Sequence, residues 1–333
     1  MVGSARFGTR SVRVRPAAAF VAVFAVVAGL LAGCSRAQQV SDPDAIGFVT
    51  TYPLPIESFV QGLVFDGTSI WTTASDLHGS ALVQVGPDGT VTVRPFTDLP
   101  DPKGIAFDGT NLWVTSGGGR GSSSVSKVTP SGEETRIFLP ADSYPSEIVF
   151  DGTNMWTGNG FLTGVTRVAP DGRQRTILFG DTYPNALAFD GTNVWSANSG
   201  VGRKAVVYRI SPSGLLTPFE LPDGTDPAGI AFDGTDMWTA NRGTDSVSRI
   251  TAGGAIATFR LPRGSSPTGI AFDGVDMWTT DNDTASVSRI TPTGKVTSYR
   301  LPPDSYPAEI VFDGTNMWTL DHRTTAVSKI RAR

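Results

Sequence analysis

The sequence contains only one cysteine and two histidines among its 333 residues. A single thiol cannot form an internal disulfide, so the fold has to be held together without one. The sequence also has no zinc-ligand spacing, no Ser/His/Asp or Cys/His nucleophile arrangement and no phosphate-cradling glycine loop. These absences exclude the enzyme and binding classes that are built on such motifs.

Basic residues are scarce outside the N-terminal segment. Residues 1–33 hold four of the 27 basic residues and none of the 31 acidic ones, so the remaining 300 residues carry a net charge of −8. An acidic surface without basic clusters argues against nucleic acid as a partner, and against direct electrostatic attraction to anionic lipid.

The N-terminal segment has the features of an export signal. Four unpaired arginines precede an apolar run, Ala17–Ala32, that is too short and too rich in Ala and Gly for a permanent membrane span. The run ends in Leu31-Ala32-Gly33-Cys34, which resembles the lipobox of bacterial lipoproteins. This resemblance implies cleavage before Cys34 and acylation of its thiol and new amino terminus. The alternative is a chance cysteine after an ordinary signal peptide.

On the lipoprotein interpretation, the protein is exported by the general secretory route and lipid-anchored to the bacterial cell envelope, on its extracytoplasmic side. We expect residues 1–33 to be a cleaved signal peptide. Residues 34–44 would then be the lipidated cysteine and a short polar tether. Contact with the membrane is expected through the acyl chains alone.

One motif, Phe-Asp-Gly-Thr-(Asn/Asp)-x-Trp, recurs seven times at intervals of 39 to 43 residues. Two copies depart from it: Ser69 replaces the Asn or Asp of the first copy, and Val275 replaces the Thr of the sixth. Its copies begin at Phe65, Phe107, Phe150, Phe189, Phe232, Phe272 and Phe312. Every tryptophan of the protein ends one copy: Trp71, Trp113, Trp156, Trp195, Trp238, Trp278 and Trp318. Such a period indicates a repeat architecture, not two independent domains.

Each unit has the pattern of four short strands. In residues 228–261, strands are expected at 228–233, 236–241, 246–251 and 255–261, and Asp233-Gly234 supplies the first tight turn. No stretch of the mature chain has a helical period. Four strands per roughly 40–45 residues is typical of a propeller blade. The sequence therefore predicts an all-β, seven-bladed β-propeller with four antiparallel strands per blade, formed by residues 45–331 as one domain.

The two ends of the repeated region are incomplete units that complement each other. Residues 46–54 match a fourth strand, and residues 326–330 match a third. We predict that the last blade takes three strands from residues 308–331 and its outermost strand from residues 46–54.

Two columns of repeated side chains are expected to be structural. Seven blade-to-blade interfaces need the same packing residue, whereas one ligand does not, so the tryptophans are predicted to be core residues rather than sugar-stacking platforms. A basic column on the third strands is predicted to be a solvated or turn-paired face rather than an anion site. Its members are Lys127, Arg167, Arg209, Arg249, Arg289 and Lys329.

The string Pro-Ala-Gly-Ile-Ala-Phe-Asp-Gly-Thr-Asp-Met-Trp-Thr-Ala-Asn at 227–241, followed by Ser-Val-Ser-Arg-Ile-Thr, resembles the streptogramin B (virginiamycin B) lyase family. Copies at 267–281 and 307–321 extend the likeness over residues 45–330. The repeat is also similar to NHL-like and gluconolactonase-type propellers.

The lyase resemblance implies a metal-assisted elimination that linearises a cyclic depsipeptide, carried by a magnesium ion and histidines near the central channel. In that family the histidines directly follow the proline that opens an inner strand. The matching positions here hold no histidine: they are Gln61, Lys103, Ser146, Asn185, Ala228, Thr268 and Ala308. The lyase chemistry therefore does not carry over residue by residue.

Loops at the inner-strand entrances and between second and third strands are where propellers usually bind ligands. The entrances contribute Glu57, Tyr144, Glu147, Tyr183, Tyr306 and Glu309. The two histidines, His78 and His322, fall in equivalent loops of the first and last units, which ring closure makes neighbours. With Asp281, Glu309 and Asp321 they form a candidate site for a divalent cation, Mg²⁺ or Ca²⁺. The alternative is a set of solvated loop side chains.

Two function classes remain open. The first is a non-catalytic binding or interaction propeller at the cell envelope, monomeric, with a protein or small-molecule ligand on the entrance face. The second is a metal-dependent enzyme of the lyase or lactonase kind acting at the channel mouth. A histidine or three convergent carboxylates at the channel would favour the enzyme, and a channel lined by Gly, Ala, Ser and Thr would favour binding.

Overall fold

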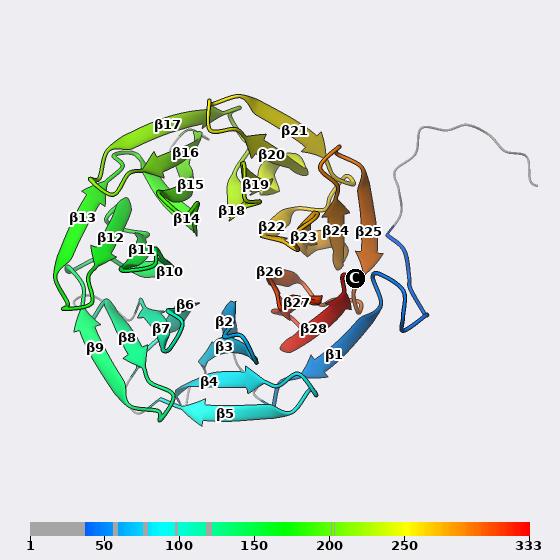
Figure 1. The fold of residues 1–333 in the computed structure, drawn as a ribbon, viewed down its shortest axis with the longest axis horizontal. Coiled ribbons are helices and arrows are strands. Elements are labelled where there is room, and N and C mark those ends of the chain that lie inside the picture. The colour runs from blue at the N-terminus through cyan, green and yellow to red at the C-terminus, as the bar shows by residue number, and fades with distance from the viewer. Residues whose placement is uncertain are drawn as a thin grey trace, which may run out of the picture. The chain divides into compact units, whose positions relative to one another are not determined.

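The computed structural model describes residues 37–55, 59–75, 79–96, 99–117, 122–200, 202 and 204–333. Backbone contacts separate Met1–Gly33 from Cys34–Arg333. Within the second unit, seven four-stranded antiparallel sheets are arranged radially around a central axis (Figure 1). The predicted all-β seven-bladed propeller is confirmed. None of the helices that can be described is long and apolar enough to cross a membrane.

The strands follow the predicted order, with the innermost strand of each blade first. Blade 1 comprises β2 Phe59–Phe65, β3 Ile70–Ser75, β4 Ser80–Val85 and β5 Val91–Pro95. Blade 2 comprises β6 Pro102–Phe107, β7 Leu112–Ser116, β8 Ser124–Val128 and β9 Glu134–Phe138. Blade 3 comprises β10 Pro145–Phe150, β11 Met155–Asn159, β12 Gly164–Val168 and β13 Gln174–Leu178. Blade 4 comprises β14 Thr182–Phe189, β15 Val194–Gly200, β16 Ala205–Ile210 and β17 Leu216–Leu221.

The last three blades continue the pattern. Blade 5 comprises β18 Pro227–Phe232, β19 Met237–Asn241, β20 Ser246–Ile250 and β21 Ile256–Arg260. Blade 6 comprises β22 Pro267–Phe272, β23 Met277–Asp281, β24 Ser286–Ile290 and β25 Val296–Arg300. Blade 7 comprises β26 Pro307–Phe312, β27 Asn316–Asp321, β28 Ala326–Arg331 and the N-terminal β1 Val49–Pro53. Single 3-10 turns, η2 Arg242–Thr244 and η3 Asn282–Thr284, follow β19 and β23.

The ring closes as predicted. Strand β1 pairs antiparallel with β28, from Val49 opposite Ile330 to Pro53 opposite Ala326. The outermost strand of blade 7 thus comes from the start of the propeller, and the other three come from its end. Because both termini contribute to one sheet, the blade joins the ends of the ring without a disulfide.

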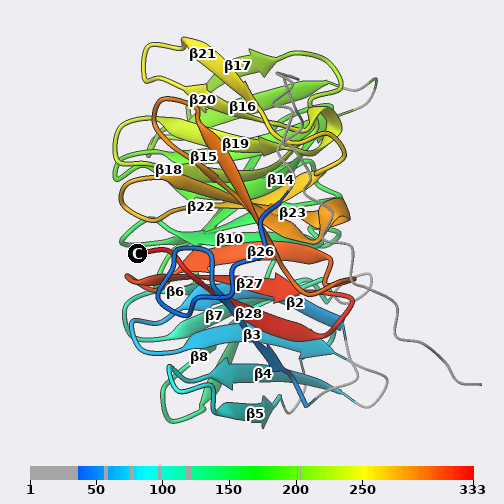
Figure 2. The same cartoon turned by 90° about the vertical axis from the view of Figure 1, so that its right-hand side faces the viewer.

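The chain before β1 also binds the propeller. Gln38 forms a parallel bridge with Tyr299 of β25, in which its N–H donates to the Ser298 carbonyl (2.7 Å) and its own carbonyl accepts from the Arg300 N–H (2.8 Å). In Figure 2 the blue N-terminal segment crosses the outer side of blades 6 and 7 before it enters β1. Residues 37–40, which the sequence places in a tether, therefore lie against the edge of blade 6. An exposed strand edge offers unpaired backbone groups to such a segment.

The tryptophan column forms the core between blades, as predicted. All seven indoles are at most 6% exposed. Trp238 of blade 5, for example, packs with Ile270, Met277 and Ile290 of blade 6. Each indole thereby helps to bury the next blade's inner strands, which is the packing that seven equivalent interfaces require.

Each tryptophan also has a hydrogen bond that the motif did not reveal. Its indole N–H donates to the aspartate of the same Phe-Asp-Gly-Thr turn, at 2.6 to 2.8 Å in all seven blades. The other carboxylate oxygen accepts backbone N–H groups of the turn, as in Asp151 with Thr153 and Asn154. One carboxylate therefore fixes both the turn and the indole.

The basic column lies over the tryptophans. The six cationic groups are 5.1 to 6.0 Å from the centres of the indole rings of their own blades. Arg167, Arg209 and Arg249 also donate to carbonyls in the outer turn of the next blade. This is the turn-paired structural face that the sequence predicted, with a cation–π contact added.

Candidate functional site

Every inner strand carries a β-bulge just after it begins. The pairing of β10 with β11, for example, shifts between Pro145 and Glu147, and that of β26 with β27 between Pro307 and Glu309. Equivalent shifts occur on the other five inner strands. Bulges redirect side chains, and here they do so beside the central axis.

At one position of this bulge, neighbouring inner strands approach each other closely. A Cβ added to Gly62, Gly104, Gly229 or Gly269 would lie 2.2 to 2.7 Å from a carbonyl oxygen of the next inner strand. Glycine is therefore required in these four blades. The same position holds Ala186 in blade 4, but in blades 3 and 7 it holds a glutamate, Glu147 and Glu309. Blades 3 and 7 therefore differ from the others in placing a charged side chain at this position.

The two glutamates line a cavity of about 240 Å³ at the centre of the ring. Its walls come from the inner strands of blades 1, 2, 3, 4 and 7, which surround the axis in Figure 1. Its polar lining residues are Gln61, Lys103, Ser146, Glu147, Glu309 and His322. The channel is therefore not bare, because it concentrates two carboxyl groups, an ammonium group and an imidazole in one small space.

Glu147 and Glu309 have no hydrogen-bond or ion-pair partner among the residues that the structure describes. Each side chain is partly exposed and lines the cavity. Burial raises the pKa of both carboxyl groups, and the negative charge of Glu309 raises the pKa of Glu147 further, well above its ordinary value. A carboxyl group whose pKa is raised keeps its proton to a higher pH than an exposed one and can donate it.

Lys103 contributes the positive charge of the cavity. Its ammonium lies 2.9 Å from a carboxylate oxygen of Asp101 and 5.8 Å from the centre of the Tyr144 ring. These contacts hold the ammonium between Asp101, at the entrance of blade 2, and the aromatic ring of Tyr144, at the entrance of blade 3. The lysine charge is therefore already balanced by Asp101, and the two glutamates remain without a counter-ion.

His322 follows β27 directly, and its backbone N–H donates to the Tyr306 carbonyl (3.2 Å). The residue is exposed and also lines the cavity, so it lies where the cavity opens. Partial burial lowers the pKa of its imidazole, which favours the neutral ring near pH 7. The structure thus brings together two of the predicted site residues, Glu309 and His322.

Asp281 and Asp321 are placed differently. Each is fully buried at the end of its strand and accepts hydrogen bonds from hydroxyl groups of its own blade: Asp281 from Thr279, Ser286 and Ser288, and Asp321 from Thr319 and Ser328. Burial raises the pKa of Asp281 to about 7 and that of Asp321 to about 6, although the hydroxyl bonds oppose this shift. Neither residue lines the central cavity.

The same position is an asparagine in blades 3, 4 and 5. Asn241, for example, accepts from Thr239 and donates to Ser246 and Ser248. The two aspartates therefore belong to a repeated hydrogen-bond network inside the blades. The loop assignment from the sequence missed this, because these residues are the last of their strands and point into the sheet.

The remaining predicted residues lie outside the described part of the chain. These are His78, Cys34 and the entrance residue Glu57. The distance between the two histidines and the lipidation of Cys34 therefore stay predictions. Within the part that is described, no three His, Cys, Asp or Glu side chains converge closely enough to hold a metal ion. Because the predicted Mg²⁺ or Ca²⁺ site includes His78, it stays a prediction.

Two of the seven positions that match the lyase histidines, Asn185 and Thr268, form side-chain hydrogen bonds with the next blade. The Asn185 amide donates to Ser199 and to the Pro227 carbonyl of blade 5, and the Thr268 hydroxyl contacts Thr280 and the Ala308 carbonyl. Three others, Gln61, Lys103 and Ser146, line the cavity.

Glu147, which the sequence places at an inner-strand entrance, is the cavity residue that the predicted cation site omitted. Aligning the repeats would have identified it, because it replaces the glycine of the Pro-x-Gly-Ile string. The same departure marks Glu309, so the two glutamates are related by the repeat.

Comparisons with known proteins agree with this architecture. A sequence profile of the virginiamycin B lyase family matches residues 153–333, more than half of the chain. No curated protein sequence matches the chain closely enough to count as a relative.

Among solved structures, virginiamycin B lyase from Staphylococcus aureus is similar at 21% identity and a TM-score of 0.74, over 85% of this chain and 99% of that one. A catalytically inactive variant of that enzyme with quinupristin gives 22% identity and a TM-score of 0.76, with the same coverage. A putative 6-phosphogluconolactonase from Bacteroides fragilis gives 17% identity and a TM-score of 0.57, over 81% of this chain and 89% of that one. At these identities the structures establish a shared fold.

Proposed function

Since the chain belongs to the virginiamycin B lyase family, we propose that it is an envelope-anchored propeller that binds a small molecule in its central cavity. The ligand would present N–H or O–H donors, or a positive charge, to Glu147 and Glu309. Binding without chemical conversion is the leading form of this proposal, because the family's histidine positions hold other residues.

The observation that carries the proposal is the pair of partnerless carboxyl groups in the cavity. Leaving polar groups without partners in a protein interior costs free energy, and two like charges close together add to that cost. A ligand that donates hydrogen bonds or positive charge to both groups would recover this free energy on binding.

Export and lipid anchoring rest on the sequence. We infer them from the basic n-region, the apolar run and the Leu-Ala-Gly-Cys string. Mass spectrometry of the N-terminal peptide from bacterial membranes should find Cys34 as the acylated first residue. A Cys34→Ser variant should be released from the membrane fraction, and a wild-type protein with an unmodified Cys34 would contradict the anchoring.

Binding can be tested on the soluble protein that begins after Cys34. We would screen small primary amines and amides by thermal shift, and titrate the hits by calorimetry against wild type and the double variant Glu147→Gln, Glu309→Gln. Glutamine keeps the size of each side chain and removes its negative charge. The double variant should lose affinity for charged amines by tenfold or more, in line with about 1.4 kcal/mol or more of lost interaction. The matched control is Glu220→Gln, an exposed position on β17. Equal affinity in all three proteins would place the ligand elsewhere.

A second candidate is an elimination reaction, and the presence of His322 beside Glu309 favours it. A neutral imidazole can remove a proton, and a carboxyl group with a raised pKa can donate one to the leaving oxygen. We would incubate the protein with quinupristin and separate the products by chromatography, because an elimination that opens a ring changes retention but not mass. Opening that is lost in His322→Ala would support the lyase, and binding without opening would support the binding protein.

A further inference from the structure

The N-terminal segment is fixed to the rim of the propeller, which is the outer surface formed by the fourth strands. Besides the two backbone bonds of Gln38 with β25, the Arg300 Nε donates to the Ala37 carbonyl at 3.0 Å. Val40 and Ile46 pack against the cluster that contains Trp278 and Tyr299. From residue 37 onward the chain therefore has a defined path along blades 6 and 7.

This path limits how far an anchor at Cys34 can stand from the protein. A free tether of residues 35–44 would span up to about 36 Å, but the three residues from Cys34 to Ala37 span at most about 11 Å. A folded unit of this size has a radius of roughly 25 Å, estimated from its expected radius of gyration. An anchor this short holds the rim of blade 6 close to the lipid surface and leaves little room for either flat face to turn toward it.

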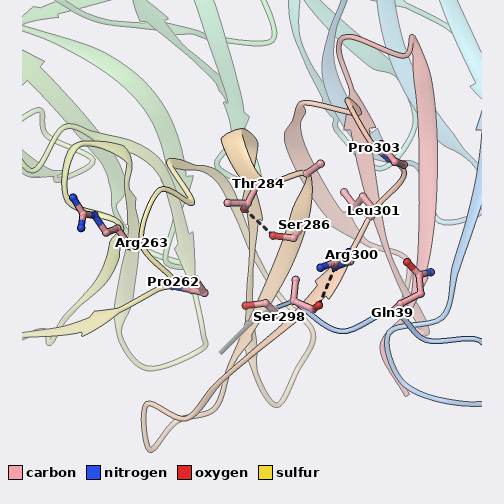
Figure 3. Close-up of a pocket in the computed structure, with 11 residues that line it drawn as sticks. Gln39, Pro262, Arg263, Thr284, Ser286, Ser298, Arg300, Leu301 and Pro303 are labelled. Atoms are coloured by element: carbon pink, nitrogen blue, oxygen red, sulfur yellow. Dashed lines mark hydrogen bonds between the residues drawn. The ribbon is translucent and has the colours of Figure 1, made fainter. Parts of the chain in front are cut away.

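Beside Ala37, the edge at which the rim of blade 6 meets the entrance face has a surface suited to lipid. A pocket of about 660 Å³ lies between the segment, the outer end of blade 6 and the loop that leaves blade 5 (Figure 3). Its lining includes Pro262, Leu301 and Pro303, together with the exposed Arg263 and Arg300, and it contains no acidic residue. Leu301 is buried, and the exposed Asp283 and Asp304 adjoin the lining. The two arginines and Pro303 are therefore the groups that this edge offers to anionic headgroups. Such a contact would add to the acyl chains, through which alone the sequence leads us to expect membrane contact.

We propose that the protein stands edge-on at the membrane, with the rim of blade 6 against the bilayer and Arg263 and Arg300 at the lipid phosphates. This orientation rests on the lipid anchoring at Cys34 proposed above. The channel axis then runs parallel to the bilayer plane, so the central cavity opens sideways along the envelope. Ligands would reach it without passing between the propeller and the membrane.

Because Cys34 is the only cysteine, the protein can be coupled to lipid at this one position, and its orientation can then be measured. The protein comprising residues 34–333 would be joined through Cys34 to maleimide lipid in phosphatidylcholine vesicles containing phosphatidylglycerol. A fluorophore would be attached to p-azidophenylalanine at one of four exposed positions. These are Pro303 in the entrance loop of blade 7 beside the near rim, Arg175 on the far rim, Thr192 on the face of the Phe-Asp-Gly-Thr turns and Tyr183 at the start of β14, at the entrance of blade 4.

Nitroxide-labelled lipid should quench the fluorophore at Pro303 several-fold more than at the other three positions. Inserting about ten Gly and Ser residues after Ser35 restores a long tether and should remove the difference without touching the folded body. Arg263→Glu should weaken quenching at Pro303 on anionic vesicles, whereas Arg175→Glu should not.

Equal quenching at all four positions, or strongest quenching on either flat face, would overturn the edge-on orientation. Since Cys34 is coupled chemically, this outcome does not depend on acylation in cells. Failure of acylation in cells would contradict the anchoring proposal and leave the orientation on coupled vesicles unaffected. The ligand-binding proposal is tested separately, by the cavity variants of Glu147 and Glu309.

Discussion

The two ends of the inner strands differ in how faithfully they repeat. At the turn end, the same aspartate accepts the same indole hydrogen bond in all seven blades. At the channel end, the bulge position holds glycine in four blades, alanine in one and glutamate in two. Both ends belong to the same strands, only a few residues apart.

This difference distinguishes residues that every blade needs for its own structure from residues that serve the single central cavity. Every blade has to close a tight turn and bury an indole, so the Asp–Trp pair recurs without exception. A ring has only one central cavity, so a residue that serves it can appear in one or two blades. Departures from the repeat are therefore a better guide to a site than the repeat itself, and Glu147 and Glu309 are such departures.

The largest effect is expected at the repeated end. Trp238→Ala removes a side chain that is 1% exposed and packs two blades together. The cavity it leaves should lower the free energy of unfolding by about 3–5 kcal/mol. Urea denaturation followed by circular dichroism would measure this. A loss below about 0.5 kcal/mol, as at a surface site, would make the column a recognition surface.

The features that repeat could be predicted from the sequence, and those that occur once were harder to predict. The spacing of the Phe-Asp-Gly-Thr copies was enough for seven blades, and the incomplete units at residues 46–54 and 326–330 were enough for the closure. Binding of Gln38 to β25 could not be predicted, because it uses backbone groups that every residue has. The network around Asp281 was missed because alternation along a strand, not loop position, decides where its carboxyl group points.

The next effect contrasts Asp281 with its counterpart Asn241 in blade 5. The folded pKa of Asp281, about 7, lies above the unfolded value of about 4, so the folded state holds a proton that the unfolded state releases. Its contribution to stability is complete below pH 4 and is lost as the pH rises to 7. Asp281→Asn removes this loss and should be more stable than wild type by about 2–4 kcal/mol at pH 8.

The control for Asp281→Asn is the pH profile itself. At pH 4 the two proteins should differ by less than about 0.5 kcal/mol, because the wild-type carboxyl group is then protonated in the folded state and about half protonated in the unfolded state. Urea titrations between pH 4 and pH 8 would follow the difference. A variant that is less stable than wild type at pH 8 would mean that the three hydroxyl bonds hold a carboxylate in place.

A smaller effect of opposite pH dependence is expected at the turn end. Burial alone would raise the pKa of Asp151, but hydrogen bonds from Asn154, Trp156 and Thr153 outweigh it and lower the pKa. The resulting stabilisation is present above the unfolded pKa and is lost as the pH falls through the folded one. Asp151→Asn cannot accept the indole bond with its amide nitrogen, so it should cost about 1–2 kcal/mol at pH 7. The cost should shrink below pH 4, and a cost that does not change between pH 7 and pH 3 would contradict a role of the charge.

The smallest effect is expected from the cations over the indoles. The Arg167 guanidinium lies 6.0 Å from the centre of the Trp156 ring and donates to the Pro212 carbonyl of blade 4 at 3.3 Å. The side chain is partly exposed, so water screens its charge, and Arg167→Met should cost only about 0.5–1 kcal/mol. Methionine keeps the packing of the alkyl chain over the ring and removes the charge, while Arg167→Lys keeps the charge and should recover about half of the loss. Because the contact is electrostatic and partly solvated, the cost should also fall in 1 M salt. A loss above about 2 kcal/mol, measured by urea unfolding, would show that these contacts between blades rival the tryptophans in holding the ring together.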